Sequence, residues 1–422
     1  MIDWVSVNQY KSNMHTHTTQ SNDPIEKFTT SYVVDRYHAA GYKILALTDH
    51  DYCTYPWNLF PQMMNGVPAR DPEALGMLAV PGNELSKDNT NSWDERTGGQ
   101  FNHHNDFFTG RQGQEFASLQ ESYAYTYALG GMQIINHPGQ YWNLSTTYSE
   151  TEKNGPGWHA TNFKTYPSLV GLEVYNQGNR RPNDRILWDQ ILERTMPERP
   201  VFGYSGDDTH NDEQLFRNYN MMLMEELTTE ELKDAMRKGA TYFCYEPKGS
   251  GEAKAPRITN IVVDEDNKTI TIEADGLVHW IYGTDMTSTS ASSTRSSVVG
   301  IGKTFNYTNF QGTYVRALIT NVYGETCTQP FGFKSENGTD VENVITDEQL
   351  SIVVFPNPAA DQLTVFLNEV SDDETLCVYD ITGKQVMRHR VEGNLTILPV
   401  HNLTSGIYLV ETGKRNARFI KK

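Results

Sequence analysis

The amino-acid sequence predicts an α/β sheet or barrel followed by two small all-β sandwich domains, and three observations lead to this prediction. Up to about residue 245, short aliphatic runs alternate with longer helical patterns, which is typical of repeated βα units. From Pro256 the pattern changes to short alternating strands separated by Gly, Asn, Asp and Ser. A polar, acidic stretch then precedes a third segment that is again rich in short strands and turns. We therefore expect domains at 1–250, 256–335 and 350–422, with a linker at 336–349.

Within the first domain the order of helix, stop signal and strand predicts a mostly parallel arrangement. Asp23-Pro24 is predicted to begin a helix that runs to Ala40. Gly41 ends this helix, because glycine favours the left-handed conformation that follows a helix terminus, and a strand is expected at Lys43–Thr48. The last helix of the domain is predicted over Glu226–Gly239, before a closing strand at Thr241–Tyr245.

Composition excludes several classes of protein. The chain has 422 residues, which is too long for one ordinary core. Its formal net charge of −18 argues against an extended nucleic-acid surface, since phosphate contacts are supplied mainly by Lys and Arg. No apolar run is long enough to predict a transmembrane segment. Neither a zinc ribbon nor a disulfide framework is indicated, because no CxxC spacing occurs among Cys53, Cys244, Cys327 and Cys377.

Side chains that bind metals follow each hydrophobic strand that can be drawn in the first 250 residues. The carboxyl ends of strands in a βα barrel converge on one mouth, so these side chains should meet in space. A mixed set of imidazoles and carboxylates suits Zn, Mn or Fe, whereas an all-oxygen set would suggest Ca or Mg. The sequence therefore predicts a polynuclear metal site. The residues that follow these strands are His15, His17, His50, Glu84, His137, Asp208 and His210.

These residues fall into ordered blocks that resemble the PHP (polymerase and histidinol phosphatase) metallohydrolases over about residues 8–245. The blocks are His15-x-His17 with Asp23 six residues later, Leu47–Asp51, Gly82–Glu84, Asn136–Pro138 and Gly206–His210. The resemblance implies a distorted seven-stranded, TIM-like βα barrel that holds two or three divalent metal ions.

The resemblance also implies how the ligands are shared among three metals, with Glu84 as a bridge. The expected groups are His15, His17, Glu84 and Asp208; Glu84, His103 and His137; and Asp23, His50 and His210. The imidazole at 103–104 is ambiguous. We choose His103 over His104, because His103-x-Asn105 is closer to the family pattern and alternation along a strand separates the two rings.

The activity implied by this resemblance is hydrolysis of small phosphate esters, including nucleotide or oligonucleotide phosphates, by a metal-activated hydroxide. Glu84, Asp208 and His210 are the predicted catalytic residues. Arg180 and Arg181 follow the strand Val170–Tyr175 and are predicted to clamp the substrate phosphate, because guanidinium groups bind phosphate with two parallel hydrogen bonds.

Other carboxylates are expected to support the ligands. Asp49, Asp51 and Asp207 lie beside ligand residues and are predicted to orient imidazoles or bound water. Glu173 lies in the strand at 170–175 and is a weaker candidate for a place at the site.

Two alternative functions stay open at this point. A metal-dependent hydrolase of another bond, such as an amide or a sugar ester, would use the same ligand types. A non-catalytic surface protein could instead keep structural metals and bind a glycan or protein partner through its β-sandwich. A complete ligand set argues against the second alternative, since structural sites need no open coordination position.

The last 70 or so residues are similar to the C-terminal sorting domain of type IX secretion in Bacteroidetes. The residues that carry this resemblance are Phe355–Ala359, Val378–Lys384, Ser405–Val410 and Phe419–Lys422. It implies export by the type IX secretion machinery, an outer-membrane or extracellular destination and removal of this tail. A signal peptide outside the given sequence is also expected.

Overall fold

The computed structural model describes residues 2–422 with the exception of 22, 58–69, 87–101, 112–115, 117, 285–295, 334–351, 356, 368–369, 372, 392 and 414. The predicted linker at 336–349 lies outside the described residues.

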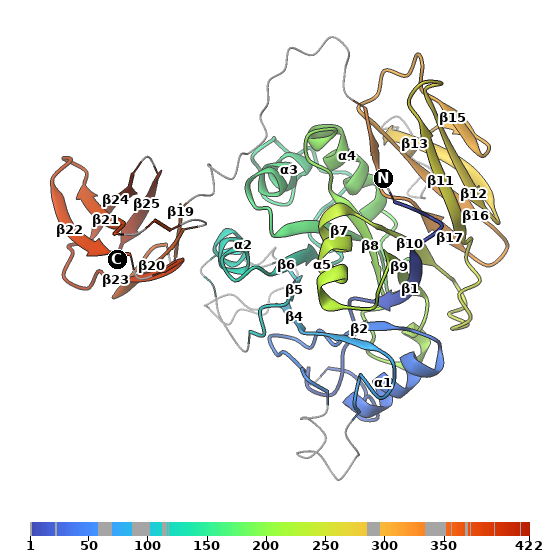
Figure 1. The fold of residues 1–422 in the computed structure, drawn as a ribbon, viewed down its shortest axis with the longest axis horizontal. Coiled ribbons are helices and arrows are strands. Elements are labelled where there is room, and N and C mark those ends of the chain that lie inside the picture. The colour runs from blue at the N-terminus through green and yellow to red at the C-terminus, as the bar shows by residue number, and fades with distance from the viewer. Residues whose placement is uncertain are drawn as a thin grey trace.

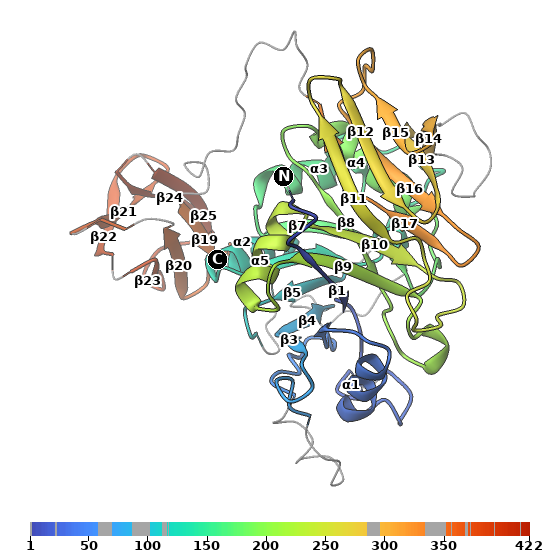
Figure 2. The same ribbon diagram turned by 45° about the vertical axis from the view of Figure 1, so that its right-hand side comes forward.

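The strands of the first part of the chain form two sheets, one that runs in the order β10-β9-β1-β2-β3 and another in the order β4-β5-β6-β7-β8 (Figures 1 and 2). Strands β1, β2 and β3 pair in parallel, and β6, β7 and β8 also pair in parallel. However, β5 is antiparallel to both β4 and β6, and β9 is antiparallel to both β1 and β10. The prediction of a mostly parallel sheet is therefore wrong in part, because a helical connection can return the chain to either end of a sheet. The strands are β1 (Asn8–Asn13), β2 (Ile44–Ala46), β3 (Leu78–Val80), β4 (Gly82–Leu85), β5 (His104–Phe107), β6 (Met132–Ile135), β7 (Leu169–Asn176), β8 (Phe202–Gly206), β9 (Asn218–Met224) and β10 (Thr241–Tyr245).

Helices lie on the outside of these strands (Figure 1). Among the described residues, no helix is both long enough and apolar enough to span a bilayer. Short 3₁₀ turns, η2 (Pro138–Gln140) and η3 (Asp212–Gln214), follow β6 and β8. The helices are α1 (Thr30–Ala39), α2 (Leu119–Ala128), α3 (Pro156–Thr165), α4 (Asp184–Thr195) and α5 (Thr229–Lys238).

The first helix begins later than predicted. Helix α1 starts at Thr30, and Thr29 caps it by accepting a hydrogen bond from the backbone N–H of Tyr32. The expected start at Asp23-Pro24 is wrong, because Asp23 instead faces two histidines of the site described below. The predicted stop is correct, since Gly41 has a φ of 77° in the left-handed region.

The β-rich segment after residue 256 continues the same large sheet. Strand β10 pairs with β17 through the register Phe243 opposite Cys327, so hydrogen bonds cross the predicted boundary at 250–256. The hydrophobic core is also shared, since one buried cluster contains Tyr242 together with Trp280 and Val315. The strands of this segment are β11 (Ile258–Asp264), β12 (Thr269–Ala274), β13 (Leu277–Thr284), β14 (Ser296–Ile301), β15 (Thr304–Asn306), β16 (Tyr314–Thr320), β17 (Glu325–Cys327) and β18 (Phe331–Gly332).

The C-terminal segment has two sheets, ordered β19-β20-β23 and β22-β21-β24-β25. Its own buried cluster includes Leu363, Val378, Val410 and Phe419. The segment therefore consists of two sheets with a buried cluster of its own, and its description as a β-sandwich stays a prediction. The strands are β19 (Ile352–Phe355), β20 (Gln362–Leu367), β21 (Thr375–Asp380), β22 (Gln385–Arg390), β23 (Leu395–Pro399), β24 (Gly406–Thr412) and β25 (Arg415–Lys421).

Candidate metal centre

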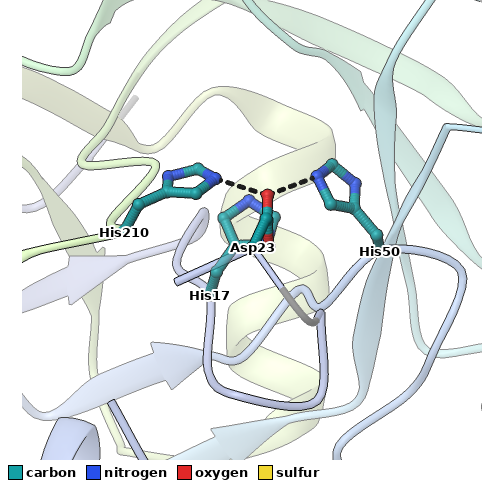
Figure 3. Close-up of side chains that lie close together, drawn as sticks. All are labelled: His17, Asp23, His50 and His210. Carbon is teal, nitrogen blue, oxygen red and sulfur yellow. Dashed lines mark hydrogen bonds and ion pairs between the residues drawn. The ribbon is translucent and has the colours of Figure 1, made fainter. Parts of the chain in front are cut away.

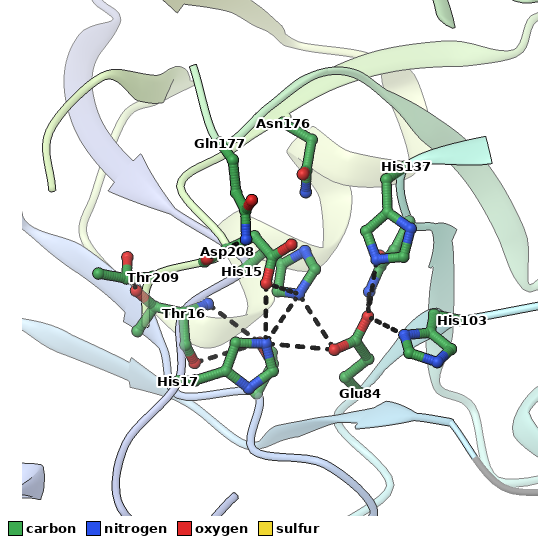
Figure 4. A network of polar contacts seen from close by, with 12 residues as sticks. His15, Thr16, His17, Glu84, His103, His137, Asn176, Gln177, Asp208 and Thr209 are labelled. Atoms are coloured by element: carbon green, nitrogen blue, oxygen red, sulfur yellow. Dashed lines mark hydrogen bonds and ion pairs between the residues drawn. The ribbon is translucent and has the colours of Figure 1, made fainter. Parts of the chain in front are cut away.

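Four buried side chains point their ligand atoms at one common point (Figure 4). His15 and His17 follow β1, Glu84 lies in β4, and Asp208 follows β8. The Nε2 atoms of the two histidines are 3.2 Å apart. Each Nε2 is also 3.2–3.3 Å from Oε2 of Glu84 and 3.1–3.4 Å from Oδ1 of Asp208. We call these four residues the inner group.

The spacing of the inner group fits a tetrahedral metal ion. Four ligands at typical zinc distances would be separated from one another by about 3.3–3.6 Å. The contacts in the inner group, at 3.1–3.4 Å, are close to these edge lengths. In addition, Oε2 of Glu84 is buried and lies 3.2–3.3 Å from ring nitrogens of His15, His17 and His50. A divalent cation would satisfy this oxygen, so the residues present fit the expected group.

The other oxygen of Glu84 faces a second group of ligands. Its Oε1 lies 3.1 Å from Nδ1 of His103 and 3.3 Å from Nε2 of His137. Asn136 donates a hydrogen bond of 2.8 Å to the same oxygen. We call His103, His137 and Glu84 the middle group. Because Glu84 presents a different oxygen to each side, its carboxylate can bridge neighbouring metal positions.

His104 has a different environment from His103. Its Nδ1 lies 3.1 Å from the backbone carbonyl of Asn102 and its Nε2 lies 2.9 Å from the hydroxyl of Ser122, away from Glu84. Burial lowers the pKa of His104 to about 3, so this ring is neutral. Among the described contacts, the imidazole from this pair that faces Glu84 is that of His103.

The third group lies at the outer edge of the centre (Figure 3). Oδ2 of Asp23 is 3.2 Å from Nε2 of His50 and 2.8 Å from Nε2 of His210. The rings of His17 and His50 have centroids 4.6 Å apart, so the inner and outer groups adjoin. The side chains of Asp23 and His210 are 38% and 25% exposed, whereas those of the inner group are at most 8% exposed. The outer group therefore faces solvent.

Glu173, a weaker candidate in the sequence, supports two ligands. Its Oε1 is 2.8 Å from Nδ1 of His15, and its Oε2 accepts hydrogen bonds of 2.9 Å from the backbone N–H of His137 and 2.8 Å from the Asn176 amide. Because a carboxylate only accepts, His15 carries its proton on Nδ1 and leaves Nε2 for a metal. Gly206 in β8 makes this approach possible, since a Cβ at that position would collide with Oε1 of Glu173.

The carboxylates predicted to orient ligands differ in what they contact. Asp49 accepts hydrogen bonds from Thr18 and Ser21, which belong to the loop after the histidine pair. Asp51 accepts from the backbone and hydroxyl of Ser86, and neither of these two contacts is to an imidazole. Asp207 accepts from Tyr37 and from the backbone of Phe216 and Asn218. Asp51 and Asp207 therefore hold the loops that carry the ligands.

The charged side chains of the inner group shift one another's pKa values. Burial lowers the pKa of His17, but hydrogen bonds to Asp208 and Glu84 outweigh burial and raise it to about 10. Burial raises the pKa values of Glu84 and Asp208, yet the charge of His15 and the other imidazoles holds both well below their usual range. Protons on the imidazoles thus balance the carboxylates in the metal-free chain. A metal cation would replace these protons, and its binding would weaken as the pH falls.

Two residues of the site have unusual backbone conformations. His137 has a φ of 29° and Asp208 has a φ of 46°, both in the region that residues other than glycine rarely adopt. Asp208 is held there by a hydrogen bond of 2.9 Å from its N–H to the carbonyl of His15. Such strain is typical of functional positions, since the surrounding structure must over-determine it.

The two arginines predicted to clamp phosphate lie on loops beside the ligands. Arg180 donates a hydrogen bond of 2.6 Å to the side chain of Gln177, and Gln177 in turn donates to the backbone carbonyl of Asp208 at 3.0 Å. Arg181 donates at 2.8 Å to Gln140, which lies in the turn after His137. Both guanidinium groups are thus connected to the segments that carry ligands, through one intervening amide.

The comparisons with known proteins identify the C-terminal segment. Residues 353–422 match the family model for the secretion system C-terminal sorting domain. This confirms the resemblance of the tail and its type IX secretion targeting, and it marks the protein as secreted or located at the cell surface. No curated protein matches the chain in sequence.

Solved structures that resemble this chain do so at low sequence identity. A two-domain protein from Bacteroides vulgatus, described as containing a predicted PHP-like metal-dependent phosphoesterase, is 16% identical; the match covers 78% of this chain and 98% of that one, with a TM-score of 0.42. The lesion-specific endonuclease PfuEndoQ from Pyrococcus furiosus is 14% identical over 55% of this chain and 56% of its own, with a TM-score of 0.35. A candidate metal-dependent phosphoesterase from Bifidobacterium adolescentis is 15% identical over 47% of this chain and 87% of its own, with a TM-score of 0.31.

Proposed function

We propose that this chain is a secreted metal-dependent phosphoesterase that hydrolyses small phosphate esters, including mononucleotide or short oligonucleotide phosphates. The observation that carries the proposal is the convergence of the inner and middle groups on the two oxygens of Glu84, with the outer group joined to them through His50, whose Nδ1 lies 3.2 Å from Oε2 of Glu84. We further propose that β3 and β4, which are interrupted only at Pro81, act as one strand of a seven-stranded barrel that ends with β8.

The ligand set suits two or three divalent ions of Zn, Mn or Fe, because it mixes imidazoles with carboxylates. Such ions supply Lewis acidity, which lowers the pKa of a water molecule and neutralises phosphoryl oxygens. The chain itself provides the fixed ligand geometry. Glu84 and Asp208 present oxygens to adjacent imidazoles, and hydrogen bonds behind the imidazoles fix the nitrogen that each ring presents.

Access to the centre supports a substrate that enters beside the outer group. The side chains of Asp23 and His210 are partly exposed, while those of the inner group are closed off from solvent. We propose that Arg180 and Arg181 close on the substrate phosphate after exchanging their amide partners for phosphate oxygens, because a charged acceptor gives stronger hydrogen bonds than an amide. The net charge of −18 favours small substrates over long polyanions.

The proposed function is tested by hydrolysis assays on chelator-stripped protein reloaded separately with Zn, Mn, Fe or Mg. The substrates are a panel of phosphomonoesters and phosphodiesters that includes nucleotides. We expect phosphate-ester cleavage that depends on the added metal and is lost in His17→Ala and Asp208→Ala, because each substitution removes one ligand of the inner group.

Thermal melting of both variants serves as the control that the chain still folds. Tight metal binding without cleavage of any phosphate ester would contradict the proposal. That result would favour a hydrolase of another bond or a binding protein with structural metals.

A further inference from the structure

The hydroxyl of Ser21 occupies a position between ligands of two adjacent groups. It lies 2.9 Å from Nδ1 of His17, which belongs to the inner group. It also accepts a hydrogen bond of 2.9 Å from the backbone N–H of His50, which belongs to the outer group. Its third partner is Oδ1 of Asp49, again at 2.9 Å. One hydroxyl therefore contacts both groups and a buried carboxylate.

The direction of each hydrogen bond at Ser21 follows from what its partners can do. A backbone N–H such as that of His50 only donates. Asp49 receives hydrogen bonds from the backbone and hydroxyl of Thr18 and from the hydroxyl of Thr54, so it acts as an ionised acceptor. The single proton of the Ser21 hydroxyl must therefore point to Asp49. The hydroxyl oxygen is then left with acceptor capacity only.

The directions of these hydrogen bonds fix the tautomer of His17. Because the Ser21 oxygen can only accept from His17, the ring must carry its proton on Nδ1 and donate it to Ser21. Its Nε2 then faces Oε2 of Glu84 at 3.2 Å and Oδ1 of Asp208 at 3.1 Å, and a metal ion bound there would replace the proton on this nitrogen. With the metal bound, the opposite tautomer would place a proton in the middle of the inner group.

Ser21 also fixes the relation between His17 and His50. The same oxygen receives the ring N–H of one residue and the backbone N–H of the other, and the two rings lie with centroids 4.6 Å apart. His17 contributes to both the inner and the outer clusters of ligand atoms. A shift of Ser21 would therefore change both clusters together.

We infer that Ser21, held by Asp49, is a positioning residue that sets the tautomer of His17 and aligns the inner and outer metal groups. The inference rests on the proposed metal centre and deepens it. Glu173 plays the corresponding part for His15 and His137 on the opposite side of the centre. The ligands of the centre are thus supported by two chemically different partners. One is the carboxylate of Glu173, and the other is the hydroxyl of Ser21, which is itself hydrogen-bonded to the carboxylate of Asp49.

The inference is tested by metal retention in Ser21→Ala, measured by competition with a chromogenic chelator and by metal analysis after dialysis. Removing such a supporting hydrogen bond should weaken metal binding by about 10–100-fold. Ser21→Thr keeps the hydroxyl and should restore most of the affinity. Thr54→Val is the matched control, because it removes a hydroxyl that donates to Asp49 and leaves the hydrogen bonds of Ser21 to His17 and His50 in place.

The outcomes separate this inference from the proposed function. Wild-type affinity and stoichiometry in Ser21→Ala would overturn the inference, whatever the hydrolysis assays show. Normal metal binding by the wild-type chain without hydrolysis would overturn the proposed function and leave the role of Ser21 intact. If Ser21→Ala does not fold, Ser21→Gly takes its place, since it also lacks the hydroxyl, adds no metal ligand and should give the same loss. Equal loss in Thr54→Val and Ser21→Ala would also contradict the inference.

Discussion

At the residue scale, single hydrogen bonds decide which nitrogen of a ligand histidine is available. His15 donates from Nδ1 to Glu173, and His210 lies with Nδ1 2.8 Å from the backbone carbonyl of Asp208. Both acceptors lack a proton of their own, so both rings keep Nε2 for the interior of the site. The ligand set is therefore preorganised before any ion binds.

Replacing Glu173 by Gln should weaken metal binding by about 10–100-fold, because the carboxylate that orients His15 and raises its ligand strength is lost. The amide of the new Gln also carries an N–H. This N–H would face either the Nδ1–H of His15 or the N–H groups of His137 and Asn176, all of which are donors themselves. Chelator competition measures the change. Glu150→Gln serves as the control, since Glu150 pairs with Arg194 at the surface; equal metal affinity in both variants would contradict the role of Glu173.

Sequence reasoning could find candidate ligands at this scale, but it ranked Glu173 only as a weaker candidate and did not find Ser21. The candidates fall at strand ends in a mixed pattern of imidazoles and carboxylates, which can be seen in the sequence. Glu173 and Ser21 carry no such signal. One is an ordinary polar residue within a strand, and the other is an ordinary serine in a loop. Their importance depends on distances that arise only when β7 and the loop after β1 pack against the ligand histidines, Glu173 against His15 and Ser21 against His17.

At the element scale, α3 buries a histidine with no hydrogen-bond partner among the described residues. His159 is fully buried, and neither ring nitrogen is bonded. Its ring packs edge-on against Trp158 with centroids 4.9 Å apart. Burial lowers the pKa of His159 to about 3. In the folded chain this imidazole therefore stays neutral until the pH falls to about 3.

Acid should destabilise the protein through this helix. Below pH 6.5 the unfolded chain binds a proton on this histidine that the folded chain binds only near pH 3, so stability falls as the pH drops between these values. From pH 7 to pH 5 this residue alone should lower the free energy of unfolding by about 2 kcal/mol.

His159→Phe should reduce that loss, as measured by denaturant unfolding at the two pH values. The exposed His38, replaced in the same way, provides the comparison. An identical pH dependence in His159→Phe and the wild type would contradict the assignment.

The start of α1 shows why element boundaries were harder to predict than elements. Asp23-Pro24 has the sequence of a helix N-terminus, since an Asp cap and a following Pro are both favoured there. In the structure Thr29 provides the cap, and the carboxylate of Asp23 faces His50 and His210 instead. A carboxylate suited to capping is equally suited to binding a metal, and local sequence does not distinguish the two uses.

At the scale of the whole molecule, a buried ion pair joins the part of the chain that carries the metal ligands to the β-rich segment after residue 256. Arg316 in β16 donates two hydrogen bonds of 2.7 Å to the carboxylate of Asp189 in α4. Ser296 and Tyr314 donate to the same carboxylate at 2.6 Å and 3.0 Å. Asp189 thus accepts hydrogen bonds from side chains of both β14 and β16. These bonds hold the two parts of the chain at a fixed orientation.

Breaking this pair on one side should be costly. Arg316→Met leaves the Asp189 carboxylate buried without its cation and should lower the free energy of unfolding by about 3–5 kcal/mol. The double variant Asp189→Leu with Arg316→Met should recover much of that loss, because no uncompensated charge remains. Denaturant unfolding measures both. A single variant within about 1 kcal/mol of the wild type would show that the pair does not hold the two parts together.

The pairing of β10 with β17 decides how this enzyme candidate can be divided. A cut near residue 250, where the sequence pattern changes, would strip β17 from β10 and leave a row of unpaired N–H and C=O groups on a strand rich in aromatic residues. Such an open edge recruits other chains and leads to aggregation. Any fragment intended to retain the metal ligands would therefore have to extend through β18. A gene fusion joined at residue 250 would therefore produce an insoluble protein instead of a soluble domain that keeps the metal ligands.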